Sequence, residues 1–244
     1  RRSIWGVTCL GFRSGRRWTG ERFSEGCFLH SALGERGDMT VDRKAHWDSV
    51  YGEESEAQLS WHQDDPRVSF EHIEMAGATA NSSVIDIGGG TSRLASLLLA
   101  TGLHDLTVLD LSQVALDVAK DRLGQAGETV KWMSADITTW APDRHYDLWH
   151  DRAVFHFLVD PAGRAAYLKS LVRGVSIGGH AIIATFAPDG PEKCSGLPVA
   201  RYSPSDLAEL LGESFELVAH RHHLHQTPSG KSQSFQFSFF RRCR

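Results

Sequence analysis

The sequence predicts an α/β fold: a doubly wound, mostly parallel sheet of seven strands, with helices on both faces and an antiparallel hairpin at one edge. Short apolar runs alternate with segments of helical period from residue 83 onward. Strands and helices in that order form parallel strands joined by crossover helices. The alternating run SFQFSFF at residues 234–240 follows the preceding strand with no helix between them. We therefore expect these last two strands to form the antiparallel hairpin.

Each element is predicted from the period of its segment. Strands are expected where short apolar runs are bounded by turn residues, at residues 83–87, 106–110, 130–133, 146–150, 180–186, 215–222 and 234–240. Helices are expected at residues 41–51, 93–101, 113–123, 164–172 and 204–211. Pro66 suits the start of one more helix, whose apolar face would carry Val68, His72, Ile73 and Ala76.

Composition limits the class of protein. The 244 residues carry a formal net charge of −4, and no basic run indicates nucleic-acid binding. No apolar stretch approaches the length of a membrane-spanning helix. The cysteines lack a CxxC pair, so we expect neither a disulfide framework nor a zinc site, and a cytoplasmic location is the default. They are Cys9, Cys27, Cys194 and Cys243.

Residues 1–38 differ from the rest of the chain. They are rich in Arg, Gly and Ser and have no sustained period, whereas a patterned sequence begins at Met39. We expect a poorly ordered leader there, either an upstream or added segment. A transit peptide is the alternative, but four acidic residues in the leader count against it. One domain is expected over residues 39–244.

The residues Gly88, Gly89 and Gly90 follow the first core strand and precede a helix. Ligands of open α/β sheets bind beyond the carboxyl ends of the strands. Glycine lets a ligand approach the backbone closely, and the helix N-terminus offers free N–H groups. A nucleotide-like ligand is therefore expected. The turn lacks both the P-loop pattern and GxGxxG, because Arg93 and Leu94 stand where later glycines would be.

Acidic residues accompany three successive strands. Asp86 lies within the first strand and could orient water or a cationic amino group near the glycines. Asp110 ends the second strand, where an acid can accept hydrogen bonds from both ribose hydroxyls. Asp136 follows the third strand, where an adenine amino group could be bound with Ile137 against the ring. Each acid taken alone also fits a turn residue or an N-cap.

The runs VIDIGGGTSRL, LTVLDLSQVAL and SADITTW together resemble the class I S-adenosylmethionine-dependent methyltransferases, over roughly residues 43–240. The resemblance implies a Rossmann-like fold and S-adenosyl-L-methionine as cofactor. Gly88 and Gly90 would face its methionine part and Asp110 its ribose. Its adenine would lie against Asp136 and Ile137. The implied cofactor-binding set is Trp61, Asp86, Gly88, Gly89, Gly90, Asp110, Leu111, Ser112, Asp136 and Ile137.

The fourth strand ends in YDLWHDRAVFHFL, a segment similar to the loop of thiopurine methyltransferase-like proteins and small lysine methyltransferases. The fold would place His150, Asp151 and Arg152 beside the methyl group, and they are the candidate catalytic residues. His150 could act as a base and Arg152 could bind an anionic substrate. The alternative is an Asp151–Arg152 loop network with His156 packed on a helix.

Three further segments complete the candidate site. SWHQDDPR resembles the N-terminal element that covers the cofactor in the same small methyltransferases, so Trp47, Tyr51 and Trp61 would cover the sulfonium. Plain core packing is the alternative. The long loop after the fifth strand offers possible substrate contacts, Lys193, Cys194 and Arg201. The run HRHHLH at residues 220–225 alternates between two strand faces, so no metal site is expected.

The leading hypothesis is a methyltransferase that acts on a small molecule. Protein-lysine methylation is the second hypothesis, and it would need an open acidic groove. An NAD-dependent dehydrogenase and a catalytically silent binding module are further alternatives, although the missing GxGxxG counts against the dehydrogenase. No nucleic-acid or membrane partner is expected, and the protein would be a monomer or a homodimer.

Overall fold

The computed structural model describes residues 42–244. The predicted leader at residues 1–38, and the start of the domain at Met39, lie outside the described residues. In residues 42–244, none of the helices has the length and apolar character that crossing a membrane requires.

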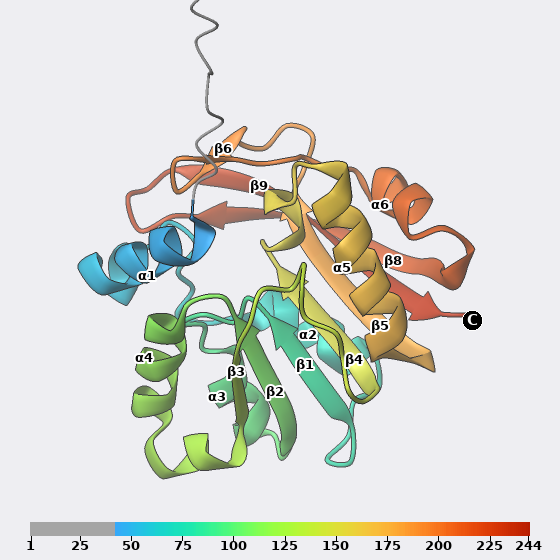
Figure 1. The fold of residues 1–244 in the computed structure, drawn as a ribbon, viewed down its shortest axis with the longest axis horizontal. Coiled ribbons are helices and arrows are strands. Elements are labelled where there is room, and N and C mark those ends of the chain that lie inside the picture. Colours follow the sequence, from blue (N-terminus) through green and yellow to red (C-terminus); the bar gives the residue numbers. More distant parts are fainter. Residues whose placement is uncertain (1–41) are drawn as a thin grey trace, which may run out of the picture. The chain divides into compact units, whose positions relative to one another are not determined.

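The described residues form a seven-stranded sheet with the order β3-β2-β1-β4-β5-β9-β8 (Figure 1). The strands from β3 to β5 are parallel, whereas β9 is antiparallel to both of its neighbours. The predicted fold class and terminal hairpin are thus confirmed. The strands are β1 Ser83–Ile87, β2 Asp105–Asp110, β3 Lys131–Ser134, β4 Tyr146–Arg152, β5 Val175–Phe186, β8 Phe215–Gln226 and β9 Ser232–Arg242.

Helices cover both faces of the sheet. The longer ones are α1 Arg43–Glu53, α2 Arg67–Met75, α3 Leu94–Ala100, α4 Gln113–Leu123, α5 Pro161–Gly174 and α6 Pro204–Leu211. Single 3-10 segments lie at Glu56–Gln58, Gly124–Thr129, Phe155–Phe157 and Gly212–Ser214. The helix starts follow capping chemistry: the side chains of Asp42, Ser112 and Asp160 each accept a backbone N–H of the first turn.

Alternate residues of the central strands supply two hydrophobic cores. Val84 of β1 packs in the core beneath α2 and α3, whereas Ile85 and Ile87 pack in the core beneath α5 and α6. The whole of β1 is buried, as expected for a strand inside a parallel sheet. Asp86 therefore points to the α2 side of the sheet, where a buried carboxylate needs polar partners.

Several bounds differ from the prediction. β5 begins at Val175 rather than at residue 180, because its register shifts where Tyr146 pairs with Val175 and Gly178 has a positive φ. β4 continues through Asp151 and Arg152, which were expected to follow it in a loop. Pairing with β9 extends β8 to Gln226, although the end of β8 is polar. A short antiparallel pair, β6 Lys193–Cys194 with β7 Leu197–Pro198, was not predicted.

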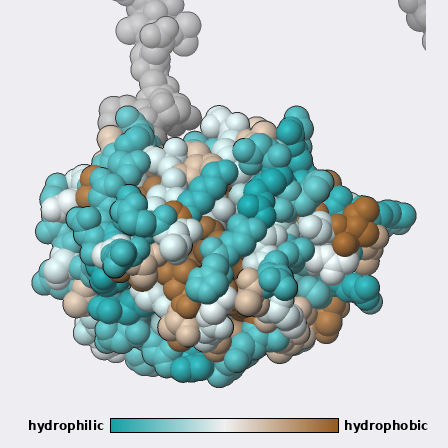
Figure 2. Space-filling model, turned by 90° about the horizontal axis from the view of Figure 1, so that it is seen from below, coloured by the Kyte–Doolittle hydropathy of each residue, from teal (hydrophilic) through white to brown (hydrophobic). Residues whose placement is uncertain are grey.

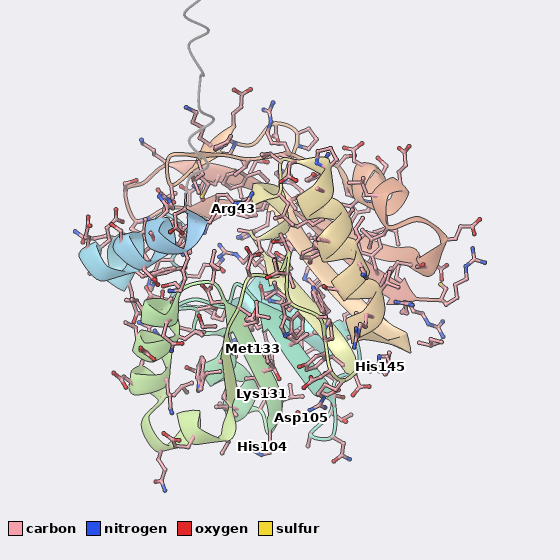
Figure 3. All side chains as sticks on the ribbon, viewed as in Figure 1. Arg43, His104, Asp105, Lys131, Met133 and His145 are labelled. Atoms are coloured by element: carbon pink, nitrogen blue, oxygen red, sulfur yellow. The ribbon has the colours of Figure 1, made fainter. Side chains whose placement is uncertain are left out.

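The carboxyl ends of the parallel strands lie at the same end of the sheet as α1. In Figure 3 the labelled Arg43 of α1 stands at that end, and the labelled His104, Asp105 and Lys131 mark the opposite end. Seen from that opposite end, the surface is mostly hydrophilic with scattered apolar patches (Figure 2). The candidate residues therefore gather at one end of the sheet, around the first βα turn.

Candidate active site

The glycine turn after β1 is held tightly between two neighbouring segments. Gly88 and Gly90 have φ values of +65° and +49°, which glycine adopts without strain. The Gly88 N–H donates to the Leu109 carbonyl oxygen at 2.6 Å. A Cβ atom on Gly88 would lie 2.0 Å from Cγ2 of Val154, and one on Gly90 would lie 2.6 Å from the Tyr51 hydroxyl. Only glycine permits this turn to lie against both β4's outgoing loop and α1.

Asp110 lies at the tip of β2 with its side chain buried. It is 7 % exposed, and its Oδ1 accepts the Ser112 N–H at 2.8 Å. Burial raises the pKa of Asp110 from 3.8 to about 6, although backbone N–H groups such as that of Ser112 counteract the rise. A buried carboxylate with few donors is suited to accept hydroxyl groups of a ligand.

Ser112 joins the tip of β2 to α1. Its Oγ caps α4 by accepting the Ala115 N–H, and it donates to Oδ1 of Asp48 at 2.7 Å. Lys44 also donates to Asp48. Partial burial raises the pKa of Asp48, but the hydrogen bonds from Lys44 and Ser112 outweigh it and hold the pKa below its usual value. A polar contact thus fixes α1 over the end of the sheet.

Asp136 and Ile137 follow β3 and lie across from Leu111. Oδ1 of Asp136 accepts both the N–H and the hydroxyl of Thr138, at 2.8 and 2.7 Å. Ile137 is buried, at 6 % exposed. A pocket borders Asp110, Leu111, Asp136 and Ile137. The predicted ribose and adenine residues therefore share one wall of that pocket.

The main pocket contains about 880 Å³ of space outside protein atoms, part of which is open solvent. Its second wall is aromatic and comes from α1, the segment before α2, the loop after β4, and β9. That wall comprises Trp47, Tyr51, Trp61, Phe157 and Phe235, with Arg152, Cys194 and Gln233 between the rings.

The aromatic residues of this wall contact one another. The Trp47 ring lies 5.6 Å from Trp61 and 5.1 Å from Phe157, and Tyr51 lies 5.9 Å from Trp61. Burial, then the charge of Asp110, raises the pKa of Tyr51 well above its usual value. Its hydroxyl is therefore neutral at physiological pH. Trp47, Tyr51 and Trp61, which the sequence predicts to cover a ligand, all line the main pocket.

Asp86, His150 and Ser69 form a buried hydrogen-bonded chain. Asp86 Oδ1 lies 2.7 Å from His150 Nδ1, and His150 Nε2 lies 2.9 Å from Ser69 Oγ. Because a carboxylate only accepts, Nδ1 carries a proton. All three residues are at most 4 % exposed. They border a second space of about 540 Å³ that also touches Gly88 and Gly89.

The two residues after His150 point to opposite faces of the sheet. Asp151 is fully buried and accepts the backbone N–H groups of Val154 and Phe155. Burial raises its pKa to about 6. Asp151 does not line either space beside the glycine turn, whereas Arg152 lines both. The structure thus brings His150 and Arg152 to the site and leaves Asp151 shaping the loop.

The loop after β5 contributes one of its three candidates. Cys194 lines the main pocket at 6 % exposed, and burial raises the pKa of its thiol to about 11. It is therefore a protonated, weakly nucleophilic thiol at neutral pH. Lys193 is exposed and borders neither space beside the glycine turn. Arg201 donates to the Gly190 carbonyl oxygen and to Glu192, away from the pocket.

The histidines of β8 alternate between faces and have separate partners. His222 lies 2.7 Å from the Ser234 hydroxyl, and His225 lies 2.9 Å from the Ser60 carbonyl oxygen. Between residues 42 and 244, no group of three or more His, Cys, Asp or Glu side chains is placed to hold a metal ion.

The pocket residues that were not expected from the sequence include Val154, Phe157, Gln233 and Phe235. Gln233 and Phe235 lie on β9, which enters the sheet between β5 and β8. The sequence SFQFSFF does signal a strand, but its place in the sheet decides which of its residues reach the site. Phe157 follows HDRAVFH, where a short 3-10 segment turns it toward Trp47.

Residues 84–179 match the family of methyltransferase domains. The fold is similar to a S-adenosylmethionine-dependent methyltransferase from Anabaena variabilis, with 13% identity, 83% of this chain and 96% of that one covered, and a TM-score of 0.66. It is similar to 1,6-didemethyltoxoflavin-N1-methyltransferase from Burkholderia thailandensis, with 18% identity, coverage of 82% and 84%, and a TM-score of 0.62.

A third similar structure is the N-methyltransferase NodS from Bradyrhizobium japonicum, with 18% identity, coverage of 81% and 98%, and a TM-score of 0.61. Comparison with curated proteins gave no match. The pocket at the carboxyl ends of β1 to β4 borders Gly88, Asp110 and Asp136. Residues 84–179 thus match a methyltransferase domain, and the described residues share the fold of these S-adenosylmethionine-dependent methyltransferases.

Proposed function

We propose that the protein transfers a methyl group from S-adenosylmethionine to a nucleophilic atom of a small-molecule acceptor. The observation that carries the proposal is the shape of the main pocket. The wall with Asp110 and Asp136 faces the aromatic wall of the same pocket, to which α1 contributes Trp47 and Tyr51. We call the space along the aromatic wall the aromatic chamber. A covered chamber suits a small acceptor, whereas a lysine side chain of a protein needs an open groove. The solved relatives named above include one whose complex contains 1,6-didemethyltoxoflavin and S-adenosylhomocysteine.

The residues present fit the cofactor. Asp110 would accept the ribose hydroxyls, and Asp136 with Ile137 would hold the adenine. The glycine turn would support the methionine part, with Asp86 facing its ammonium group, because Asp86 Oδ2 lies close beneath Gly89. When bound, the cofactor supplies an activated methyl group on a cationic sulfur. Trp61 and Tyr51 would cover that cation with their rings.

Two of the predicted catalytic residues, His150 and Asp151, would hold neighbouring groups in place. His150 has both ring nitrogens in hydrogen bonds with Asp86 and Ser69, so it would orient Asp86. Asp151 would hold the loop that carries Val154 against Gly88. Methyl transfer needs alignment and exclusion of water, both of which a covered aromatic chamber provides.

The proposal is tested with methyl-labelled S-adenosylmethionine and a cell extract that is separated afterwards into protein and small-molecule fractions. We expect the wild-type protein to label small molecules, and the Asp110→Ala variant to label neither fraction. Label that appears in lysines of the protein fraction would replace the proposal with the protein-lysine alternative. The cytoplasmic location and the monomeric or dimeric state stay predictions; fractionation and sedimentation would test them.

A further inference from the structure

Arg152 is a half-buried cation that forms no ion pair among residues 42–244. Its Nη1 donates to the Trp61 carbonyl oxygen at 3.1 Å. Its Nε and Nη2 are shut off from solvent and have no hydrogen-bond partner among residues 42–244. None of the ion pairs in that part of the chain includes Arg152, whereas Arg93 and Arg122 each pair with an acid. Guanidinium N–H groups that are shut off from water without a partner are costly, so an anion from outside the chain is a suitable partner for Arg152.

The guanidinium lies toward the aromatic chamber. Its central carbon is 5.2 Å from the centre of the Phe235 ring on β9. The nearby histidines are held neutral: burial and then the Arg152 charge lower the pKa of His156 to about 3 and that of His225 to about 4. They therefore add no positive charge beside Arg152 at neutral pH.

Gln233 supplies a second unpaired group in the same chamber. Its side chain is 9 % exposed, and its Oε1 has no partner among the described residues. It lies on β9 two residues before Phe235 and also lines the pocket. A buried amide oxygen without a donor costs stability unless a ligand supplies an N–H or O–H.

The rings around these two groups define the shape of the ligand. The Trp47 ring stands at 82° to the Trp61 ring and at 77° to the Phe157 ring. Such surfaces favour a rigid, flat ligand that loses little conformational freedom on binding. The chamber thus combines aromatic walls, one free cation and one free acceptor atom.

We propose that the methyl acceptor is an aromatic or heteroaromatic acid, whose anionic group pairs with Nε and Nη2 of Arg152 and whose N–H or O–H donates to Oε1 of Gln233. This inference rests on the proposed methyltransferase function and names the class of its acceptor. A guanidinium binds a carboxylate through two parallel hydrogen bonds, which fixes a flat acid in one orientation.

The carboxylate of the cofactor is a second source of the same chemistry, because Arg152 also borders the space beside the glycine turn. That space has other polar groups for the methionine part, from Gln63, Thr91 and Ser92. By contrast, Phe235, Gln233 and Cys194 border only the main pocket of the two spaces. The contact with Phe235 therefore favours the acceptor as the partner of Arg152.

The test measures binding of matched acids and amides to the full chain saturated with S-adenosylhomocysteine, by calorimetric titration. The pairs are 2-hydroxybenzoate with its amide, anthranilate with its amide, and indole-3-carboxylate with its amide. We expect at least one acid to bind about tenfold or more tightly than its amide. Arg152→Gln should remove that preference. The matched control Arg201→Gln, an arginine of the nearby loop that lies outside the pocket, should retain it.

S-adenosylhomocysteine itself is titrated into each variant, together with its analogue that lacks the carboxylate. We expect Arg152→Gln to change the affinity for either by less than about threefold. A tenfold loss for S-adenosylhomocysteine, absent for the analogue, would assign Arg152 to the cofactor and overturn the proposal. Equal binding of acids and amides would also overturn the proposal. The same holds if no acid binds to a protein that does bind S-adenosylhomocysteine. A wild-type protein that fails to bind S-adenosylhomocysteine would instead overturn the proposed function beneath it.

Discussion

Replacing Asp110 with asparagine should make the ligand-free protein more stable at neutral pH and at the same time impair cofactor binding. The carboxylate is 7 % exposed, and burial raises its pKa from 3.8 to about 6. Its ionised form is thus disfavoured in the folded state. Asparagine keeps an oxygen that accepts the Ser112 N–H but carries no charge to bury.

The magnitude follows from the pKa. A carboxyl group with a raised folded-state pKa contributes no penalty well below pH 3.8, and the protein loses stability as the pH rises through the interval to about 6. Above that interval the loss is about 3 kcal/mol; at pH 4.5 it is about 1 kcal/mol. The new amide N–H₂ costs about 1 kcal/mol at both pH values. The variant should therefore be about 2 kcal/mol more stable than wild type at pH 7.5 and nearly equal to it at pH 4.5.

Urea unfolding of both proteins at the two pH values measures this difference. Asp121→Asn, at an exposed position of α4, is the matched control and should show the same free energy of unfolding as wild type at both pH values. The affinity of Asp110→Asn for S-adenosylhomocysteine should fall tenfold or more, since ribose hydroxyls lose a charged acceptor. A stability difference that does not change between pH 4.5 and 7.5 would refute the reasoning.

Three further outcomes are expected. Gly88→Ala should lower the free energy of unfolding by about 2–3 kcal/mol, because its Cβ would lie 2.0 Å from the neighbouring valine and its φ is positive; a denaturant midpoint equal to wild type would contradict this. Asp48→Ala should weaken S-adenosylhomocysteine binding about fivefold, since it removes the hydrogen bond from Ser112 that holds α1. The free energy of unfolding of this variant should differ little from that of wild type. Iodoacetamide should alkylate buried Cys194 far more slowly than exposed Cys243 at pH 8, because the thiol pKa of Cys194 is about 11; equal rates by peptide mapping would count against the burial.

The positions of most strands along the chain could be predicted because each one leaves a local signal. SVIDI and LTVLD are apolar runs bounded by turns, and their bounds agree with β1 and β2 to within one residue. The start of β5 could not be predicted, since Gly178 and Gly179 interrupt its pattern and only pairing with Tyr146 extends the strand. The β6–β7 pair is too short to show a period.

Some residues of the candidate site could likewise be predicted from the sequence, and others could not. Asp110, Asp136 and the glycine turn lie where parallel strands end, so sequence order alone brings them together. The faces of β4 were not anticipated, and they separate Asp151 from Arg152. Gln233 reaches the pocket through the insertion of β9 into the sheet, a long-range contact that leaves no mark in the residues around it.

Calorimetric titration of S-adenosylhomocysteine into the wild-type chain and into Asp110→Ala tests the account most directly. We expect one molecule to bind per wild-type chain, and the affinity of the variant to fall at least tenfold because the ribose loses its acceptor. No binding to the wild-type chain, or undiminished binding to Asp110→Ala, would contradict the assignment of the pocket at the glycine turn to this cofactor.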